Sequence, residues 1–447
     1  MTPNLRDALK NRVIFVQSHS GSQVKPILGL FINNEFIQSN SGETLEAINL
    51  YDESKIADVA SARPEDVDIA VTTARKAFNS PEWRGISKSA RGELLGKLDD
   101  LVELDKLIQA TIDAWDNGKP YQDAVDIDIT EVISVLRYYA RWADKIFGRT
   151  IETDDAKLAY TRHESVGVCG QIIPWNYPAS MAVWKLGPAL ACRNTVVLKP
   201  AEQTPLSALY LAALIKEAGF PPGVVNILNG YGRTVGAAIA SHPGIDTIAF
   251  TGSTTTGRLI MKAAAVNLKN ITVETGAIKW PHVGIMSNMG QICTTTSRLY
   301  VEESIYDEFV EGFKEFTAKT SVVGTTSAKD EGDTTSSGTA PGEKGLFVKP
   351  TILTNVKDNM TVSREEIFGP VVVIQSFKTE AEVIEKANDS QSGLAAAVFT
   401  QDIVRAHRVA ATIHAGTINS SQDSSYAVPF GGYKESGIGV ASMSSIS

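Results

Sequence analysis

The sequence contains little cysteine. Among its 447 residues only three are cysteines, Cys169, Cys192 and Cys293, and they are widely spaced. Three scattered thiols are too few for the disulfide framework that small secreted domains use. This scarcity is typical of a reducing compartment, so we expect a cytoplasmic protein with free thiols.

Long apolar runs, a secretory leader and clusters of positive charge are also lacking. The most apolar stretch, residues 166–198, is interrupted by Pro178, Lys185 and Arg193, which argues against a membrane span. The N-terminus mixes acidic and basic residues ahead of a short apolar patch, unlike a signal peptide. The net charge of −9, with no Lys/Arg cluster, argues against a nucleic-acid partner.

What the chain does have is a regular alternation of strand and helix patterns. Its length is sufficient for about two to three domains. "GLFINNEF" is typical of a strand, and "PEDVDIAVTTARKAF" has helical spacing behind an acidic first turn. Strand and helix patterns then alternate in "NTVVLKP", "SALYLAALIKEAG", "GVVNIL", "RTVGAAIASH", "IDTIAF" and "GRLIMKAAAVN". This order predicts a doubly wound α/β domain with a parallel sheet.

A second α/β series follows Cys293. Its predicted elements are "SRLYVEES", "YDEFVEGFKEFTAKT", "PTILTNV", "PVVVIQSF" and "EAEVIEKAND". Residues 325–345 interrupt the series with a Gly-, Ser- and Thr-rich stretch, which we interpret as a solvated loop without a catalytic role.

Two turns of small residues follow predicted strands. "FTGSTTTGR" holds Gly252, Ser253 and Gly257 at the start of a predicted helix, and "NGYGRTVG" holds Gly232. Small residues allow a phosphate to approach backbone N–H groups at the positive end of a helix dipole. Either segment alone is as compatible with an ordinary turn as with a phosphate-binding site. Two of them at the ends of adjacent parallel strands favour a nucleotide-binding crevice.

"VVLKPAEQTP" places Lys199 and Glu202 just beyond another strand. A solvated loop is the simplest interpretation. In a nucleotide site, Lys199 would hydrogen-bond ribose hydroxyls, and Glu202 would repel a 2′-phosphate, which favours NAD over NADP.

Most lone cysteines are small buried hydrophobic residues, and the apolar surroundings of Cys169 and Cys192 fit that interpretation. Cys293 differs, because Gly290, Gln291 and a threonine run place it in a polar turn ahead of a strand. A thiol of ordinary pKa is only about 3% ionised at pH 7, so a nucleophilic cysteine needs a base or a positive field.

"GQICTTTSR" resembles the nucleophile segment of the aldehyde dehydrogenase superfamily. Further segments match in the family's order from about Leu30 to Gly439: "FINNEF", "DNGKPY", "GVCGQIIPWNYP", "NTVVLKPAEQTP", "FTGSTTTGR", "REEIFGPVV" and "PFGGYKESGIG". The similarity is to NAD-preferring fungal and animal enzymes. It implies NAD-dependent oxidation of an aldehyde to a carboxylic acid through a thiohemiacetal and a thioester.

The resemblance implies specific roles for residues of this chain. Cys293 would be the nucleophile, Glu274 the general base and Asn176 a donor to the oxyanion. The implied cofactor-binding residues are Trp175, Lys199, Glu202, Gly232, Gly252, Ser253, Gly257, Glu366 and Phe368, with no metal site.

The resemblance also implies a division of the chain. Residues 1–145 and 163–273 would form the NAD-binding domain, residues 146–162 a protruding β-hairpin for oligomerisation, residues 274–430 the catalytic domain and residues 431–447 a shortened C-terminal segment. The hairpin corresponds to "FGRTIETDDAKLAYTRHE".

The chain departs from the family pattern at three places. About fifteen residues, one strand plus its turn, have no counterpart between Glu274 and Cys293, so we expect the sheet to re-pair there. The stretch Thr275 to Lys279 can span at most ~17–18 Å, which still permits the two residues to meet. "AGTIN" lacks the family's usual aromatic residues, which predicts an altered substrate tunnel.

The family's C-terminal strand is absent after Gly439, so we expect a weakened homo-oligomer. These departures keep one alternative open: a catalytically impaired relative that binds nucleotide or a partner protein. NAD binding without thiol reactivity at Cys293 would distinguish it from the enzyme.

Overall fold

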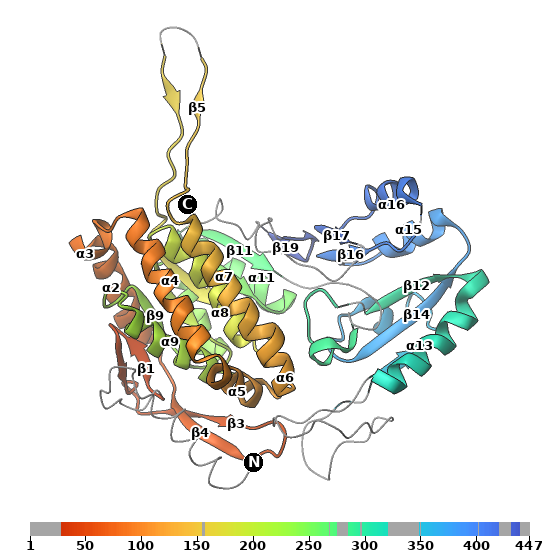
Figure 1. Ribbon diagram of the computed structural model, residues 1–447, viewed down its shortest axis with the longest axis horizontal. Helices are drawn as coiled ribbons and strands as arrows, with labels where there is room; N and C mark the ends of the chain where they lie inside the picture. Colours follow the sequence, from red (N-terminus) through yellow and green to blue (C-terminus); the bar gives the residue numbers. More distant parts are fainter. Residues whose placement is uncertain are drawn as a thin grey trace.

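The computed structural model describes residues 28–153, 157–267, 269–274, 285–295, 297–320, 348, 350–400, 402–419 and 431–438. The predicted loop at 325–345, the link from Thr275 to Lys279 and the tail after Gly439 lie outside the described residues. In Figure 1 a larger body with a central sheet lies beside a smaller one, and a hairpin projects from the larger body.

The larger body is built on an eight-stranded sheet in the order β19-β11-β10-β7-β8-β9-β1-β2. Five neighbouring strands run parallel, as predicted: β11 (Asn270–Glu274), β10 (Thr247–Thr251), β7 (Val168–Ile172), β8 (Thr195–Lys199) and β9 (Val225–Ile227). β7, β8 and β9 are buried at every residue, as expected for a sheet covered on both faces.

Antiparallel strands close both edges of this sheet. On one side β19 (Gly437–Ile438) pairs with β11, and on the other β1 (Leu30–Ile32) pairs with β9 and with β2 (Glu35–Ile37). The prediction of one strand over "GLFINNEF" was wrong, because the segment folds back on itself. Asn33 and Asn34 have φ of 56° and 60°, and two such residues form the tight turn of a two-residue hairpin.

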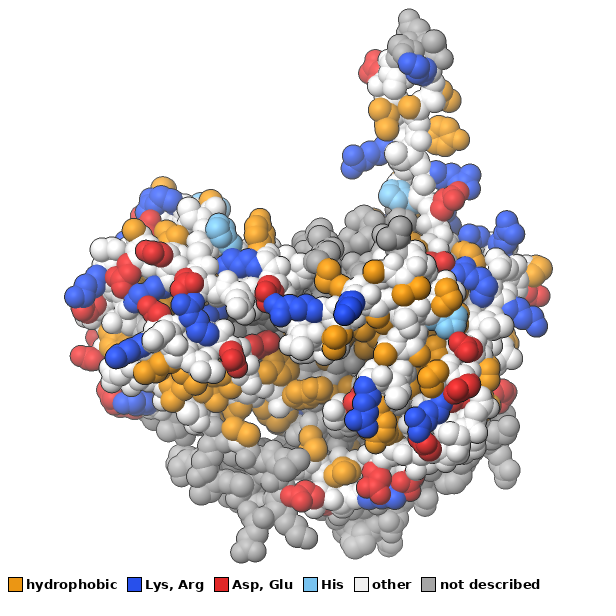
Figure 2. Space-filling model, turned by 180° about the vertical axis from the view of Figure 1, so that it is seen from behind, with side chains coloured by type: hydrophobic (Ala, Val, Ile, Leu, Met, Phe, Trp, Pro, Cys, Tyr) orange, Lys and Arg blue, Asp and Glu red, His pale blue; other side chains and the backbone are white. Residues whose placement is uncertain are grey.

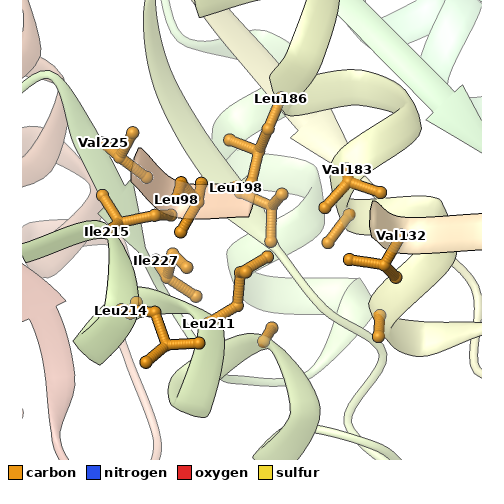
Figure 3. Close-up of a cluster of buried hydrophobic side chains, with 14 of the residues drawn as sticks. Leu98, Val132, Val183, Leu186, Leu198, Leu211, Leu214, Ile215, Val225 and Ile227 are labelled. Carbon is orange, nitrogen blue, oxygen red and sulfur yellow. The ribbon is translucent and has the colours of Figure 1, made fainter. Parts of the chain in front are cut away.

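Helices cover the two faces of the sheet, and alternate residues of β8 point to opposite faces. On one face Val196 and Leu198 join a core with α4 (Lys88–Leu104), α7 (Ile129–Trp142), α8 (Pro178–Ala191) and α9 (Leu206–Ala218). Figure 3 shows side chains of these helices converging on Leu198. On the other face Val197 packs in a second core with α2 (Pro64–Asn79), α10 (Ala237–Ser241) and α11 (Thr254–Ala264).

The smaller body has its own parallel sheet, in the order β12-β14-β13. Its strands are β12 (Arg298–Glu302), β13 (Thr351–Leu353) and β14 (Val371–Phe377), and with α13 (Tyr306–Thr320) they enclose a third core. Two short strand pairs follow in the sequence, the parallel β16 (Ala395–Ala397) and β17 (Thr417–Asn419) and the antiparallel β15 (Ser392–Gly393) and β18 (Tyr433–Lys434). The second α/β series that the sequence predicted is therefore confirmed, as a separate sheet.

One further long helix, α5 (Lys106–Asn117), also packs into the first core. Shorter elements include β3 (Thr44–Ile48), β4 (Lys55–Ala60), α3 (Pro81–Arg84), α6 (Tyr121–Asp123), α14 (Thr361–Arg364), α15 (Glu380–Asn388) and α16 (Ile403–Ala410). Within the described ranges no helix combines the length and apolarity needed to cross a bilayer.

The projecting hairpin consists of β5 (Thr150–Ile151) and β6 (Ala159–Tyr160), paired antiparallel. Figure 2 shows it standing clear of the body, with apolar and charged side chains along its length. Leu158 is 82% exposed and Tyr160 is 66% exposed. These side chains are far more exposed than apolar residues in a packed core, so the hairpin has surface available for a partner.

Candidate active site

Cys293 lies in the turn between a short 3-10 helix (Ser287–Gly290) and β12. It lines a pocket together with Glu366 and Phe368, two residues that the family resemblance implied for cofactor binding. The structure thus brings together the thiol and the segment "REEIFGP", which lies more than seventy residues further along the chain.

The turn before Cys293 requires left-handed backbone conformations at three consecutive residues. Asn288, Met289 and Gly290 have φ of 45°, 59° and 70°. A Cβ atom at Gly290 would lie 2.2 Å from the carbonyl oxygen of Gly369, so only glycine fits there. Through this close approach the turn before Cys293 packs directly against Gly369, the residue that follows Phe368.

Phe368 itself has φ of 53°, which is unusual for an aromatic residue and costs of the order of 1–3 kcal/mol. Its ring meets the ring of Trp175 edge to face, with centroids 5.6 Å apart and planes at 82°. The carbonyl oxygen of Trp175 accepts a 2.7 Å hydrogen bond from Asn117 Nδ2. Trp175 and Phe368, both predicted at the cofactor site, are therefore in contact across the two bodies.

Asn176 follows β7 and is 4% exposed. Its side-chain Nδ2 donates to the carbonyl oxygen of Gln291 at 2.7 Å, two residues before Cys293, and Oδ1 is buried without a hydrogen-bond partner. An amide nitrogen carries two N–H groups, so the second one remains for another acceptor. The predicted oxyanion donor is thus tied to the cysteine turn.

Glu366 lies at the mouth of the Cys293 pocket, where its side chain reaches solvent. The surrounding protein atoms still desolvate the carboxyl group and raise its pKa. Glu274 ends β11, where its backbone pairs with Thr251 and Gly437. The side chain of Glu274 lies outside what the structure describes, so its predicted role as general base stays a prediction.

Lys199 ends β8 and is 2% exposed. Its Nζ donates to Glu202 Oε2 at 3.1 Å and to the carbonyl oxygen of Pro200 at 2.9 Å. Burial lowers the pKa of Lys199, while Glu202 acts in the opposite direction. Burial acts to raise the pKa of Glu202, but Lys199 and nearby backbone amides, including that of Gly232, outweigh it and lower the pKa.

The turn between β10 and α11 contains Gly252 and Ser253, and Gly257 lies in the first turn of α11, where it is buried. Ser253 is the N-cap of α11, and its Oγ accepts a hydrogen bond from the Thr256 amide at 3.3 Å. A Cβ at Gly252 would lie 2.6 Å from the ring of Phe250, which explains the glycine by packing. Asn176, Lys199, Gly232 and Ser253 follow neighbouring parallel strands, so they share the carboxyl edge of the sheet.

The other two cysteines are buried thiols, as predicted. Burial raises the pKa of Cys192 to about 11 and that of Cys169 further still. Neither group is a nucleophile in this state, because the thiolate is the reactive form. In the described part of the chain no cluster of three His, Cys, Asp or Glu side chains is placed to hold a metal ion.

Two residues next to Asn176 were not singled out by sequence reasoning. Asn288 Nδ2 donates to the Asn176 carbonyl oxygen at 3.1 Å and to that of Gln291 at 3.2 Å. Lys119 Nζ donates to the same Asn176 oxygen at 3.1 Å. Lys119 belongs to the matched segment "DNGKPY", which was the available signal, but nothing in that segment indicates its contact.

Comparisons with known proteins place the chain in a family. Residues 36–336 and 324–446 match the family model described as "Aldehyde dehydrogenase family". An aldehyde dehydrogenase of Emericella nidulans is 49% identical over 92% of this chain and 91% of its own, and mouse retinal dehydrogenase 2 is 50% identical over 92% and 88%.

Solved structures show the same likeness. The NAD+ complex of an aldehyde dehydrogenase from Bacillus cereus superposes with a TM-score of 0.89 at 40% identity, over 100% of this chain and 97% of that one. A betaine aldehyde dehydrogenase from Staphylococcus aureus in complex with NAD+ gives 0.87 at 33% identity, over 92% and 91%. Because the family model covers most of its length and the relatives are about half identical to it, the chain belongs to the aldehyde dehydrogenase family.

Proposed function

We propose that this protein oxidises an aldehyde to the corresponding carboxylic acid, with Cys293 as nucleophile and NAD as hydride acceptor. The observation that carries the proposal is the shared pocket of Cys293, Glu366 and Phe368, joined to Asn176 through Gln291. The thiol and the aromatic ring line one pocket, and the amide donor is hydrogen-bonded to Gln291, two residues before the thiol. Thiol addition to a carbonyl requires this combination of nucleophile and oxyanion donor.

The residues on the sheet's carboxyl edge fit NAD. The Lys199 ammonium group donates two of its N–H groups to protein oxygens. Its third N–H group would donate to a ribose hydroxyl. Glu202 has a lowered pKa and therefore carries a negative charge at neutral pH, which suits hydroxyl donors and repels a 2′-phosphate. NAD, when bound, supplies the acceptor for a hydride.

In the first step the Cys293 thiolate adds to the aldehyde carbon and the carbonyl oxygen becomes an alkoxide. The second N–H of Asn176 Nδ2 would donate to this oxygen, together with the Cys293 backbone amide. One such donor stabilises the transition state by roughly 3–4 kcal/mol. The resulting thiohemiacetal expels a hydride as its oxygen re-forms the carbonyl, which leaves a thioester on Cys293.

Water then releases the acid. Glu274, which ends β11, would take a proton from the water as it attacks the thioester carbon. The carbon–sulfur bond breaks and Cys293 returns as a thiolate, which is a good leaving group. Each turnover thus consumes one aldehyde, one water and one oxidised cofactor.

The family relatives suggest the substrate class but not a single aldehyde. Mouse retinal dehydrogenase 2 and the Staphylococcus betaine aldehyde dehydrogenase are named for different aldehydes. We therefore propose an aldehyde substrate in the cytoplasm, with short aliphatic, aromatic and long polyene aldehydes as the panel to compare. The exposed hairpin, β5–β6, would bind a second copy of the chain.

The proposal is tested by following reduced cofactor with that aldehyde panel. Wild-type protein should turn over at least one aldehyde, Cys293→Ser should not, and the buried-thiol control Cys192→Ser should keep activity. Iodoacetamide should label Cys293 ahead of Cys192. Folded protein that binds NAD but neither oxidises an aldehyde nor reacts at Cys293 would instead support the nucleotide-binding alternative.

A further inference from the structure

A buried charged cluster lies beneath the segment that carries Asn176. Lys119 sits between α5 and α6, and its side chain has no exposed surface. Its Nζ forms an ion pair with Asp128 and lies 3.7 Å from Asp113 Oδ2 on α5. Burial of an ammonium group is costly unless it is paired and hydrogen-bonded, so this arrangement needs a reason beyond packing.

The ammonium reaches the loop after β7 at two consecutive residues. Its Nζ donates to the Asn176 carbonyl oxygen at 3.1 Å and lies 4.3 Å from the centre of the Tyr177 ring. Burial raises the pKa of Tyr177, and negative charge on Asp128 and on Cys293 acts in the same direction. Lys119 therefore contacts the peptide that bears Asn176, in the electrostatic neighbourhood of Cys293.

The same carbonyl oxygen is shared with the cysteine turn. Asn288 Nδ2 donates to it at 3.1 Å and also to the Gln291 carbonyl oxygen, which accepts from Asn176 Nδ2. The Asn176 carbonyl oxygen is thus held by two donors from different segments, and the Asn176 side chain is bonded to the turn before Cys293. Movement of that carbonyl would therefore change the direction of the Asn176 side-chain amide.

We propose that Lys119 is a positioning residue that fixes the Asn176 carbonyl, and thereby aims the Asn176 amide at the oxygen of the substrate bound to Cys293. The inference rests on the proposed aldehyde oxidation for its catalytic consequence. A charged donor makes a stronger hydrogen bond to a carbonyl than a neutral one, which suits a group that must not move. Asp113 and Asp128 lie against the ammonium group and orient it.

The competing explanation is that Lys119 only neutralises two buried carboxylates. The two explanations predict different effects of Lys119→Met on kcat when Asn176 has already been replaced by alanine. A positioning residue acts through Asn176, so its effect should vanish in an Asn176→Ala background, whereas a purely structural effect should remain.

The experiment is a double-mutant cycle with Lys119→Met and Asn176→Ala, measured as kcat and as KM for NAD. We expect Lys119→Met to lower kcat by roughly ten- to a hundredfold, since small misplacements of a catalytic group have effects of this size. KM for NAD should change less than about threefold, because the ribose contacts remain. Equal loss of kcat in both backgrounds would overturn the proposal.

A second variant separates positioning from stability. Lys119→Met combined with Asp128→Asn removes the charge on both members of the ion pair, so thermal stability should recover relative to Lys119→Met alone. The kcat value should stay low, because the Asn176 carbonyl oxygen still lacks the Lys119 donor and keeps only that of Asn288. Recovery of kcat together with stability would show that only charge balance matters and would refute the proposal.

Hydrogen exchange provides a readout that needs no turnover. In Lys119→Met, amides of residues 285–295 and of the segment around Asn176 should exchange faster, while β14 should exchange as in the wild type. Unchanged exchange of the amides at 285–295 would contradict the proposed positioning role of Lys119. If the wild-type protein oxidised no aldehyde, the proposed function would be refuted. The hydrogen-exchange measurement would still test the role of Lys119, because it does not depend on turnover.

Discussion

The side-chain amide of Asn176 donates to the carbonyl oxygen of Gln291 at 2.7 Å, two residues before Cys293. This bond joins the loop after β7, in the larger body, to the turn before β12, in the smaller one. It ties the Asn176 side chain to the cysteine turn even though the two bonded residues are 115 positions apart in the chain. Because one N–H is used in this bond, the other has a restricted direction.

This relationship predicts the effect of Asn176→Ala. The variant should bind NAD as the wild type does, because Lys199 and Glu202 are untouched. Its kcat should fall roughly a hundred- to a thousandfold, as observed when one oxyanion donor is removed. Steady-state kinetics, with cofactor binding by calorimetry, would check this; an unchanged kcat with a raised KM for aldehyde would contradict the donor role.

The backbone of the cysteine turn gives a second prediction. Gly290→Ala should destabilise the turn, since its φ is 70° and a Cβ would meet the Gly369 carbonyl oxygen. We expect a loss of at least about 1–3 kcal/mol of local or global stability and a slower alkylation of Cys293. Denaturant titration and thiol labelling would measure the two effects.

Gly312 provides the matched control for that variant. It is an exposed glycine of α13, and a Cβ there would meet no atom within 4 Å. Gly312→Ala should therefore stabilise the protein by roughly 0.5–1 kcal/mol through helix propensity. Similar losses from both substitutions would mean that the Gly290 conformation is not the cause.

Sequence patterns predicted the sheet well, because buried parallel strands form continuous apolar runs separated by helical spacing. The failure at "GLFINNEF" has a local cause. Asn33 and Asn34 interrupt two short apolar strands without Gly or Pro, so the alternation resembles one strand, although asparagine tolerates the left-handed conformation that the turn needs.

The site was predictable only in part. The roles of Cys293 and Asn176 followed from resemblance, whereas those inferred for Lys119 and Asn288 did not. Both act on a backbone oxygen, at separations of 57 and 112 residues from Asn176. A carbonyl oxygen is present at every residue, so no residue type marks it as an acceptor. Such contacts become visible only when the fold brings the segments together.

The charge of Glu202 leads to a prediction on cofactor choice. In Glu202→Gln the repulsion of a 2′-phosphate is removed, and a like charge at ~4 Å contributes about 1 kcal/mol in water and more in a pocket. The ratio of kcat/KM for NADP to that for NAD should rise by about fivefold or more. Glu93→Gln, an exposed substitution on α4, is the control and should leave the ratio unchanged.

The projecting hairpin leads to the last prediction, on assembly. Tyr160 of β6 and Leu158, just before this strand, expose large apolar surfaces, and the hairpin stands clear of the body of the molecule (Figure 2). If this hairpin binds a second copy of the chain, burial of such side chains would each contribute about 1.5–3 kcal/mol. Leu158→Asp should therefore shift the sedimentation distribution towards monomer and leave the melting temperature of the monomer unchanged. Leu259→Asp, an equally apolar exposed position on α11, is the control. A distribution that responds to Leu259→Asp and not to Leu158→Asp would place the contact elsewhere, since the hairpin then contributes nothing to association.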